Sequence, residues 1–483
     1  MNRILLYILM TVMSFNVVFS QQDNTLFFMH ELPQANFVNP AVPSTCKLFI
    51  GFPALSSIAA NYSNTEFTIN DALTKRPGSD SLYLDLDNIV SNVRGKELIT
   101  SDVDLTLFTM GIHVKQYYLT FSINEKATTY NMIPAEAMKL AWDGNTQFRG
   151  DQASVNGMRI NANSYHEFAF GASKDLKNSS WRLGARVKFL FGLGNVFTPK
   201  TNGYLYTDKT TFALNLLLDS RVNTSLPIDS ISTDENGRVT DIAFREDMTA
   251  KDYFLNFRNF GIGIDLGFIN KINDKTTLSG SLLDVGAIFW NKDVNKFSSD
   301  GQVAYTGLGV SSDFDSLQQL VDTLQYMFTP VYEPNGFSSL LVPKLYLGIT
   351  RVVAKHLNAG VLIRTELYRN RLHPSLTFSA NTFNYKTLNA SVSYTVQNGE
   401  FTNVGAGIGL KAGPVHLHLI SDNIPGFFRL DNTRNVNIRF GLSFVPGCNE
   451  RVSTEPSGPN GIRAIPCYYS PYKTGSRRKK RWR

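Results

Sequence analysis

The feature that most constrains this chain is an alternation of apolar and polar residues with a period of two, which returns in many segments. In "LNASVSYTV" every second residue from Leu388 to Val396 is apolar, and the residues between them are polar. The stretches "YYLTFSINE", "RLGARVKF" and "VNIRFGLSF" repeat this alternation. Side chains of a β-strand point alternately to its two faces, so each stretch predicts a strand with one apolar and one polar face.

These segments are about 9 to 13 residues long and are separated by turn-like clusters such as "INDKT" and "VQNGE". Neighbouring strands with such short connections pair as antiparallel hairpins. The predicted strands are residues 46–53, 57–66, 103–114, 116–125, 158–173, 181–194, 202–217 as one strand or two, 257–271, 276–290, 341–352, 356–368, 372–382, 386–397, 401–411, 414–421 and 434–445.

The polar faces of the predicted strands carry charged side chains, as the wet interior of a barrel does. We assign Arg186, Lys188, Arg364 and Glu366 to this lumen. Tilted strands of about 9 to 11 residues span a bilayer, and apolar-out, polar-in alternation is typical of outer-membrane barrels. We therefore predict an all-β fold, a transmembrane antiparallel β-barrel of about 14 strands (14 to 16), since single-chain barrels have even strand numbers. A soluble β-sandwich or soluble barrel is the alternative.

The two ends of the chain differ from the predicted barrel, which covers residues 46–446. Residues 1–20 have the basic start and apolar run of a signal peptide, cut after Ser20, which predicts export to the outer membrane of a Gram-negative bacterium. After residue 20, no apolar run reaches the roughly 18 residues that a membrane-spanning helix needs. Residues 447–483 are rich in Pro, Gly, Ser and charge, and predict a periplasmic basic tail.

The net charge of +7 is concentrated in this tail. The last seven residues, "RRKKRWR", contribute six of the positive charges, which leaves a nearly neutral body. A neutral body argues against nucleic-acid binding. The tail is predicted to meet either anionic lipid headgroups or an acidic periplasmic or outer-membrane protein, with a solvated tail as the alternative.

Some stretches interrupt the period of two. Residues 84–95, 134–144 and 314–328 have helical spacing of their apolar side chains and predict helices in loops or inside the barrel. Residues 219–256 are polar and acidic and predict a long loop.

Motifs of enzymes are absent from the sequence. There is no G-x-S-x-G, H-E-x-x-H, P-loop or C-x-x-C pattern. The glycines of "GAGIG", Gly405 to Gly409, lie in a predicted strand, where small residues permit close approach of neighbours. His416 and His418 share one strand face, and we interpret them as lumen-facing polar residues and not as metal ligands. We predict no enzymatic activity, no catalytic residue, no cofactor and no metal.

The three cysteines lie near the ends of the predicted barrel, in a compartment that permits disulfides. Cys46 begins the first strand, and Cys448 follows the last strand. We favour a Cys448–Cys467 disulfide that closes a loop of the tail, with Cys46–Cys448 and three free thiols as alternatives.

Residues 21–45 precede the first strand and contain the irregular, aromatic-rich "NTLFFMHELPQANFVNPAV". A barrel of 14 strands has a wide lumen, and irregular backbone is tolerated there because it is buried in protein. We predict that this segment is an internal hatch, with Asn39 and Pro40 fixing the turn into the first strand. The predicted ligand and hatch residues are Phe27, Phe28, Met29, His30, Phe37, Asn39 and Pro40.

The hatch segment carries a resemblance. A segment that ends in Asn39-Pro40-Ala41 just before the first strand resembles the long-chain fatty-acid transporters of the FadL type. The opening "FFMHELPQANFVNPA" is also similar to the PorP/SprF-like barrels that accompany type IX secretion and gliding. The pattern from Phe28 to Pro53, with Cys46 and Lys47, most resembles an uncharacterised family of such outer-membrane barrels.

This resemblance implies two functions. The first is passive transport of a hydrophobic or amphipathic small molecule through a lateral or hatch-controlled opening. The second is a non-transporting scaffold of a secretion or assembly complex, with a filled lumen and a partner held by residues 473–483.

Overall fold

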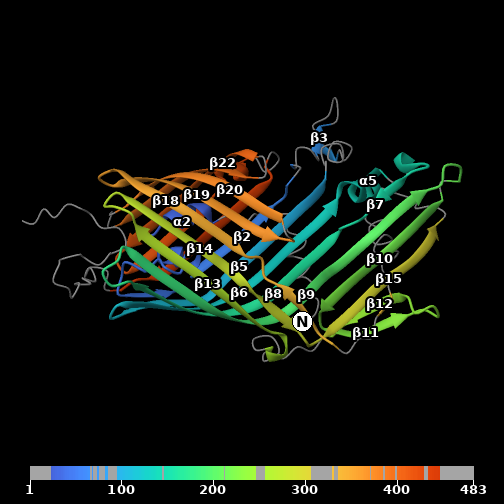
Figure 1. The fold of residues 1–483 in the computed structure, drawn as a ribbon, viewed down its shortest axis with the longest axis horizontal. Coiled ribbons are helices and arrows are strands. Elements are labelled where there is room, and N and C mark those ends of the chain that lie inside the picture. The colour runs from blue at the N-terminus through green and yellow to red at the C-terminus, as the bar shows by residue number, and fades with distance from the viewer. Residues whose placement is uncertain are drawn as a thin grey trace, which may run out of the picture.

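The computed structural model describes residues 23–65, 68, 73–75, 82–84, 95–143, 146–211, 213–245, 256–305, 329–330, 335–369, 371–383, 387–397, 400–428 and 433–446. The strand ladders are antiparallel and close into one barrel (Figure 1). Its first half contains β1 (Leu48–Gly51), β2 (Ser57–Ser63), β5 (Lys96–Val114), β6 (Tyr117–Pro134), β8 (Arg159–Asp175), β9 (Trp181–Thr207), β13 (Phe260–Lys271) and β14 (Thr276–Trp290). Its second half contains β17 (Phe337–Leu340), β18 (Lys344–Ala354), β19 (Leu357–Tyr368), β20 (Arg371–Thr382), β21 (Leu388–Gln397), β22 (Glu400–Ala412), β23 (Val415–Ser421) and β24 (Asn435–Phe444).

Two positions of the barrel wall are each shared by two short strands. β1 and β2 both pair with β5 and β24, and this contact between the first and last strands closes the barrel. β17 and β18 both pair with β14. The wall therefore has fourteen strand positions, which confirms the predicted all-β barrel and its strand number.

The two faces of the wall follow the sequence alternation. Along β9, Leu183, Val187 and Phe189 are exposed on the outer surface, while Arg186 and Lys188 are buried on the inner side. Among the described residues, no helix has the length and apolar character needed to cross a membrane.

The same sheet extends beyond the barrel at the end with long connections. β9 is 27 residues long, and its second half pairs with β10 (Leu214–Ser225), which pairs with β15 (Val294–Tyr305). This extension projects at the right of Figure 1. Smaller elements there or in loops are β3 (Leu73–Lys75), β4 (Leu82–Leu84), β7 (Gln152–Ser154), β11 (Ile228–Thr233), β12 (Val239–Phe244), β16 (Thr329–Pro330), η2 (Thr146–Phe148), η3 (Phe257–Asn259) and α8 (Ile424–Phe428).

The extension corrects part of the loop prediction. Within residues 219–256, the structure contains the end of β10 and the β11–β12 hairpin, whose turn has Gly237 at φ 74°. The strands were missed because both of their faces are largely polar or exposed. The predicted helix over 134–144 is confirmed by α5 (Ala135–Asp143), whereas residues 85–94 and 314–328 lie outside the described residues.

The opposite end of the barrel has short turns, and we call it the turn end. The chain passes there from β5 to β6, from β8 to β9, from β13 to β14 and from β18 to β19. β1 begins and β24 ends at this same end, because Ile50 pairs with Phe444.

Candidate functional site

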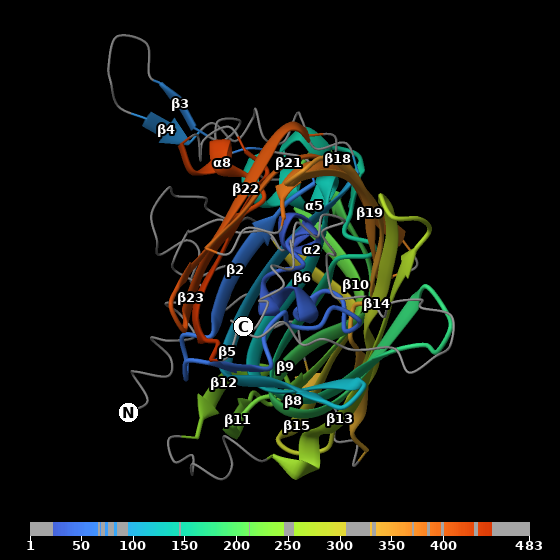
Figure 2. The same ribbon diagram turned by 90° about the vertical axis from the view of Figure 1, so that its left-hand side faces the viewer.

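Residues 23–42, which we call the N-terminal segment, lie inside the ring of strands. Figure 2 shows α2 (Asn24–Phe28) enclosed by the wall. η1 (Pro33–Phe37) follows and begins with Pro33, whose missing N–H costs nothing at the first position of a helix. Leu26, Phe27 and Met29 are at most 1% exposed.

Polar contacts tie the start of the N-terminal segment to the last strands. The backbone N–H groups of Asn24 and Thr25 donate to the Asp422 carboxylate over 3.1 and 2.7 Å. Arg439 donates to both carboxylate oxygens of Asp23, at 2.8 and 2.9 Å. Burial raises the pKa of Asp422 to about 6, against the lowering effect of its hydrogen bonds.

Side chains of the segment, most of them apolar, fill spaces left by inward-facing glycines. An added Cβ would meet a side chain of the segment at Gly348 (Phe27), Gly360 (Phe28), Gly405 (Thr25), Gly407 (Met29) and Gly409 (Leu32). Three of these glycines belong to "GAGIG". Their small size serves the approach of the N-terminal segment to β22, which explains the motif by packing.

The Asn-Pro-Ala end of the segment packs on a different part of the wall. The Asn39 side chain accepts from the Ala41 N–H over 2.9 Å and donates to the Phe268 carbonyl over 3.2 Å. Pro40 and Ala41 lie against Gly184 and Gly267, where a Cβ would meet their backbone or ring atoms. Ser281 Oγ donates to the Val38 carbonyl.

Arg186 connects the segment to a group of buried charges. Its guanidinium donates over 2.6 Å to both the carbonyl and the side-chain oxygen of Asn36. It also donates over 3.1 Å to Asp265, which is fully buried. Thus the strongest polar contact in the middle of the segment is charge-assisted.

Charged side chains from seven strands form an ion network across the lumen beyond the segment. Lys188 Nζ lies 2.8 Å from Asp265, 2.6 Å from Asp284 and 3.5 Å from Glu167. Lys126 bridges Glu167 at 3.3 Å and Asp104 at 3.9 Å, and Lys344 lies 3.7 Å from Asp284. With Arg186, the network has four cations and four carboxylates: Arg186, Lys188, Lys126, Lys344, Asp104, Glu167, Asp265 and Asp284.

The hydrogen-bonded wall is interrupted beside this network. β14 pairs with β18 as far as Leu283 and Lys344 and resumes with β17 at Ala287 and Leu340. Residues 284–286 and 341–343 are not ladder partners of one another, and Pro343 has no N–H to donate. One backbone hydrogen bond, from the Leu341 N–H to the Gly286 carbonyl over 3.0 Å, crosses this interruption. Asp284 adopts φ 60°, which is unusual for a residue other than glycine. We call this interruption the wall break.

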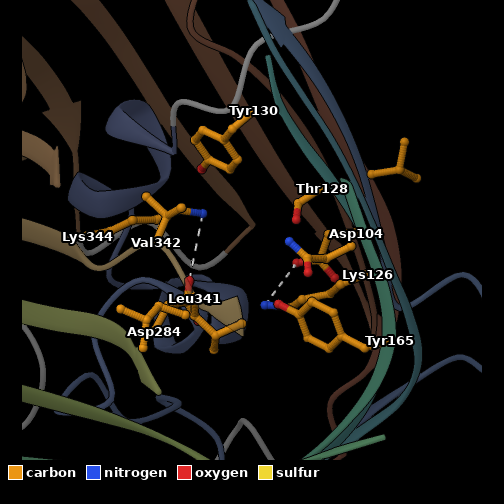
Figure 3. A pocket seen from close by; sticks show the side chains of 12 residues that line it. Asp104, Lys126, Thr128, Tyr130, Tyr165, Asp284, Leu341, Val342 and Lys344 are labelled. Atoms are coloured by element: carbon orange, nitrogen blue, oxygen red, sulfur yellow. Dashed lines mark ion pairs between the residues drawn. The ribbon is translucent and has the colours of Figure 1, made fainter. Parts of the chain in front are cut away.

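A small cavity lies on the inner side of the wall break. It has a volume of about 30 Å³ and is lined by Asp284, Leu341, Val342 and Lys344 from the break and by Asp104 and Lys126 across from it. Figure 3 shows the two ion pairs, Lys126 with Asp104 and Lys344 with Asp284, on either side of the cavity. A cavity of this size is large enough for about one or two waters.

An apolar groove lies on the outer side of the wall, next to the break. Its volume is about 620 Å³, and its rim includes exposed leucines: Leu183, Leu266, Leu282, Leu345 and Leu347. Small outward-facing residues, Ala172 and Ala185, lie between them in register. The groove also reaches Gly184, Gly267 and Ser281. One layer of backbone therefore separates this outer groove from the Asn-Pro-Ala end of the segment.

The predicted site residues divide between the segment and the network. Phe27, Phe28, Met29, His30, Asn39 and Pro40 are buried, Phe37 is half-buried, and Phe27 stacks on Tyr346 with ring centroids 5.8 Å apart. Burial lowers the pKa of His30 to about 4. Arg186 and Lys188 belong to the ion network, whereas Arg364 pairs with Glu366 and donates to Tyr346 Oη over 3.1 Å.

Sequence analysis missed Asp265, Asp284, Glu167, Lys126 and the wall break. The signal for Glu167 and Asp265 was present, because both occupy inward positions in the alternation of predicted strands. The bulge at Asp284 shifts that alternation, since Leu283 and Asp284 together stand opposite Asp265.

Cys46 is disulfide-bonded. Cys448 and Cys467 lie outside the described residues. The chain has three cysteines, so a disulfide from Cys46 uses one of these two sulfurs and the favoured Cys448–Cys467 pair is wrong. Cys46–Cys448 stays a prediction.

His416 and His418 are buried on the inner side of β23. In the described part of the chain, no group of three or more His, Cys, Asp or Glu side chains is placed to hold a metal ion.

The sequence matches one family model, described as "Family of unknown function (DUF5723)", over residues 40–422. No curated protein matches the chain.

Similar solved structures include the Ralstonia pickettii toluene transporter TbuX, at 10% identity and a TM-score of 0.38, with 86% of this chain and 94% of that chain covered. The Pseudomonas putida toluene transporter TodX is 9% identical with a TM-score of 0.37, over 85% of this chain and 93% of that chain. A Pseudomonas aeruginosa FadL homologue is 12% identical with a TM-score of 0.37, over 87% of this chain and 95% of that chain.

Proposed function

The chain belongs to the family of unknown function DUF5723, and we propose that it is an outer-membrane barrel that passes hydrophobic or amphipathic small molecules through its side wall. The observation that carries this proposal is the alignment of three features. The outer groove ends at Leu282 and Leu345, the wall break begins at Asp284 and Pro343, and the inner cavity lies behind the break.

The outer surface supports the membrane placement. Apolar side chains such as Ile262, Leu347, Val392 and Leu419 are 44 to 57% exposed on four different strands. In water such a surface would promote association, whereas in a bilayer it is the surface that lipid requires. The polar inner face, with its ion network, needs no contact with lipid.

The groove has dimensions that suit a small apolar ligand. Its volume of about 620 Å³ lies within the range of roughly 300 to 1,000 Å³ that small-molecule pockets occupy. A molecule in the groove reaches the wall break without crossing the hydrogen-bonded pairs of β9 and β13. The route then requires Leu341 and Val342 to move, because both line the inner cavity.

The N-terminal segment is the proposed hatch of this route. It fills the lumen on the turn-end side of the ion network and touches the wall directly behind the groove. Movement of Val38 to Ala41 away from Gly184 and Gly267 would open the lumen behind the groove.

The test is native mass spectrometry of the protein extracted gently from its outer membrane. We expect a bound small molecule on the wild type, its loss in Ala185→Trp, which fills the groove from the outside, and its retention in Val392→Trp, which adds the same side chain to the outer face of β21. A barrel that carries no small molecule but arrives with a stoichiometric protein partner would overturn transport. A partner released by truncation after Tyr472 would identify a scaffold.

A further inference from the structure

We propose that the turn end of the barrel is a binding surface for the phosphate groups of anionic phospholipids, built from a basic belt of six side chains: Lys115, Lys174, Lys177, Lys275, Arg351 and Lys355. The inference goes beyond the transport proposed above and rests on its membrane placement alone.

The belt follows one side of the barrel. Its members lie in or beside the four turns that join β5 to β6, β8 to β9, β13 to β14 and β18 to β19. Asp175 and Asp274 are the acidic residues in these turns and adjoining strand ends, and Asp175 is paired with Arg182 at 3.1 Å. Counting Arg182 and Lys271 at the strand ends, eight cations and two carboxylates leave an excess of six positive charges in a body that is nearly neutral overall.

Two members of the belt point toward lipid. Arg351 continues the outward column of Leu345, Leu347 and Ile349, all of which are at least 40% exposed. Lys174 continues the outward column of β8 after the exposed Phe170. A long basic side chain at the end of an apolar column places its stem on the acyl boundary and its charge at the headgroups.

Lys174 is held in place for such a contact. Its Nζ donates to Tyr117 Oη over 3.2 Å and lies 4.8 Å from the centre of the Tyr117 ring. Both residues also line the apolar groove. A phosphate beside Lys174 thus has apolar surface adjacent to it, where the acyl chains of the same lipid can lie.

These orientations favour a lipid over an acidic protein. A periplasmic protein would approach along the barrel axis and meet the turn lysines Lys115, Lys177, Lys275 and Lys355. It would not reach outward side chains on the lipid-facing wall. A phospholipid satisfies both groups, because its phosphate lies at the level where the outer apolar columns end.

The experiment compares lipid retention in nanodiscs that contain phosphatidylcholine and phosphatidylglycerol. Native mass spectrometry of the full chain counts the lipids that stay bound. We expect the wild type to retain phosphatidylglycerol preferentially and Lys174→Gln/Arg351→Gln to lose this preference by on the order of ten-fold or more, since each basic group near an anionic surface is worth about a factor of five. The control Lys200→Gln/Lys209→Gln removes two basic groups at the far end and should keep the preference.

Each variant is first inserted into nanodiscs, and its strand content is checked by circular dichroism. A variant that does not insert tests barrel folding and the membrane placement. A variant that inserts with full strand content tests the belt alone. Equal retention of both lipids by the inserted wild type, or an equal loss in the control, overturns the proposal. Inorganic phosphate that binds the barrel in pure phosphatidylcholine and is lost in Lys174→Gln/Arg351→Gln would indicate a site for a soluble anion, and would also overturn it. A co-purifying protein released by the double variant, with lipid retention unchanged, would assign the belt to a protein partner and overturn it as well.

Discussion

The lumen is filled in two different ways at two levels. Toward the turn end it is filled by the N-terminal segment, whose side chains enter spaces above glycines and whose backbone rests on Gly184 and Gly267. Beyond that level it is crossed by the ion network, whose members are part of the wall strands. The first filling is a piece of chain that can leave by breaking noncovalent contacts, whereas the second can only rearrange. A movable hatch, if the protein has one, is therefore the segment and not the network.

The largest expected effect is on the ion network. Asp265→Asn removes the carboxylate that lies 2.8 Å from Lys188 and 3.1 Å from Arg186, and leaves excess buried positive charge. Breaking a buried pair in this way costs about 3 to 5 kcal/mol. Urea unfolding in detergent micelles would measure the loss, and a change below about 1 kcal/mol would show that water enters the network freely.

The second effect concerns pH and the segment. Burial lowers the pKa of His30 to about 4, whereas a histidine in an unfolded chain titrates near 6.5. His30 of a released segment is protonated at a higher pH than His30 of the docked segment. The free energy of docking should therefore weaken by up to about 3 kcal/mol as the pH falls from about 6.5 to 4. Protease sensitivity of the segment across this range measures docking.

His30→Gln supplies the control for this titration, because Asp422 also contacts the segment and titrates within the same pH range. Burial raises the pKa of Asp422 to about 6. The difference between the wild-type and His30→Gln profiles isolates the histidine. Identical profiles would contradict the assignment of acid sensitivity to His30.

A third effect tests the contact between the wall and the segment. Gly184→Ala places a methyl group against backbone atoms of Pro40 and Ala41, which cannot move without shifting the segment. Overpacking of this kind costs about 1 to 3 kcal/mol. Gly263→Ala, on the neighbouring strand, meets Leu341 and Lys188 at an ordinary 3.5 Å and should be neutral. Cysteine labelling at position 38 would detect displacement, and equal labelling in both variants would show that the segment does not rest on Gly184.

The smallest effect is expected outside the lumen. Lys200 and Asp219 form an ion pair on the extension, with side chains 52% and 47% exposed. Asp219→Asn should change stability by at most about 1 kcal/mol, because water screens exposed pairs. Comparison with the loss of stability in Asp265→Asn tests whether burial determines how much an ion pair contributes to stability. Comparable losses of stability in the two variants would mean that water enters the ion network.

The sequence alone predicted the wall well and its contents less well. Alternation located β18 to β24 because each strand has one apolar and one polar face, and the turn residues mark their ends. It located neither β15 nor β17, and it began the strand that corresponds to β18 at residue 341, inside the wall break. The wall break depends on pairing with β14, which no local pattern records.

The contents of the lumen depend on contacts between distant residues. Asn39 and Pro40 could be assigned to a turn from their local preferences, but their partners Gly267 and Phe268 lie more than 200 residues away. Likewise, Arg186 could be assigned to the inner face by parity. Its partner Asp265 follows from the pairing of β9 with β13, and its partner Asn36 from the position of the segment inside the barrel.

The length of β9 connects three parts of the molecule. At Gly184 it touches the N-terminal segment, at Lys188 it enters the ion network, and from Asn195 onward it forms the extension with β10. A continuous strand is stiff along its axis because its backbone is nearly fully extended. One backbone of 27 residues therefore runs without a break from the wall behind the N-terminal segment, past the ion network, to the part of the barrel that lies farthest from the turn end.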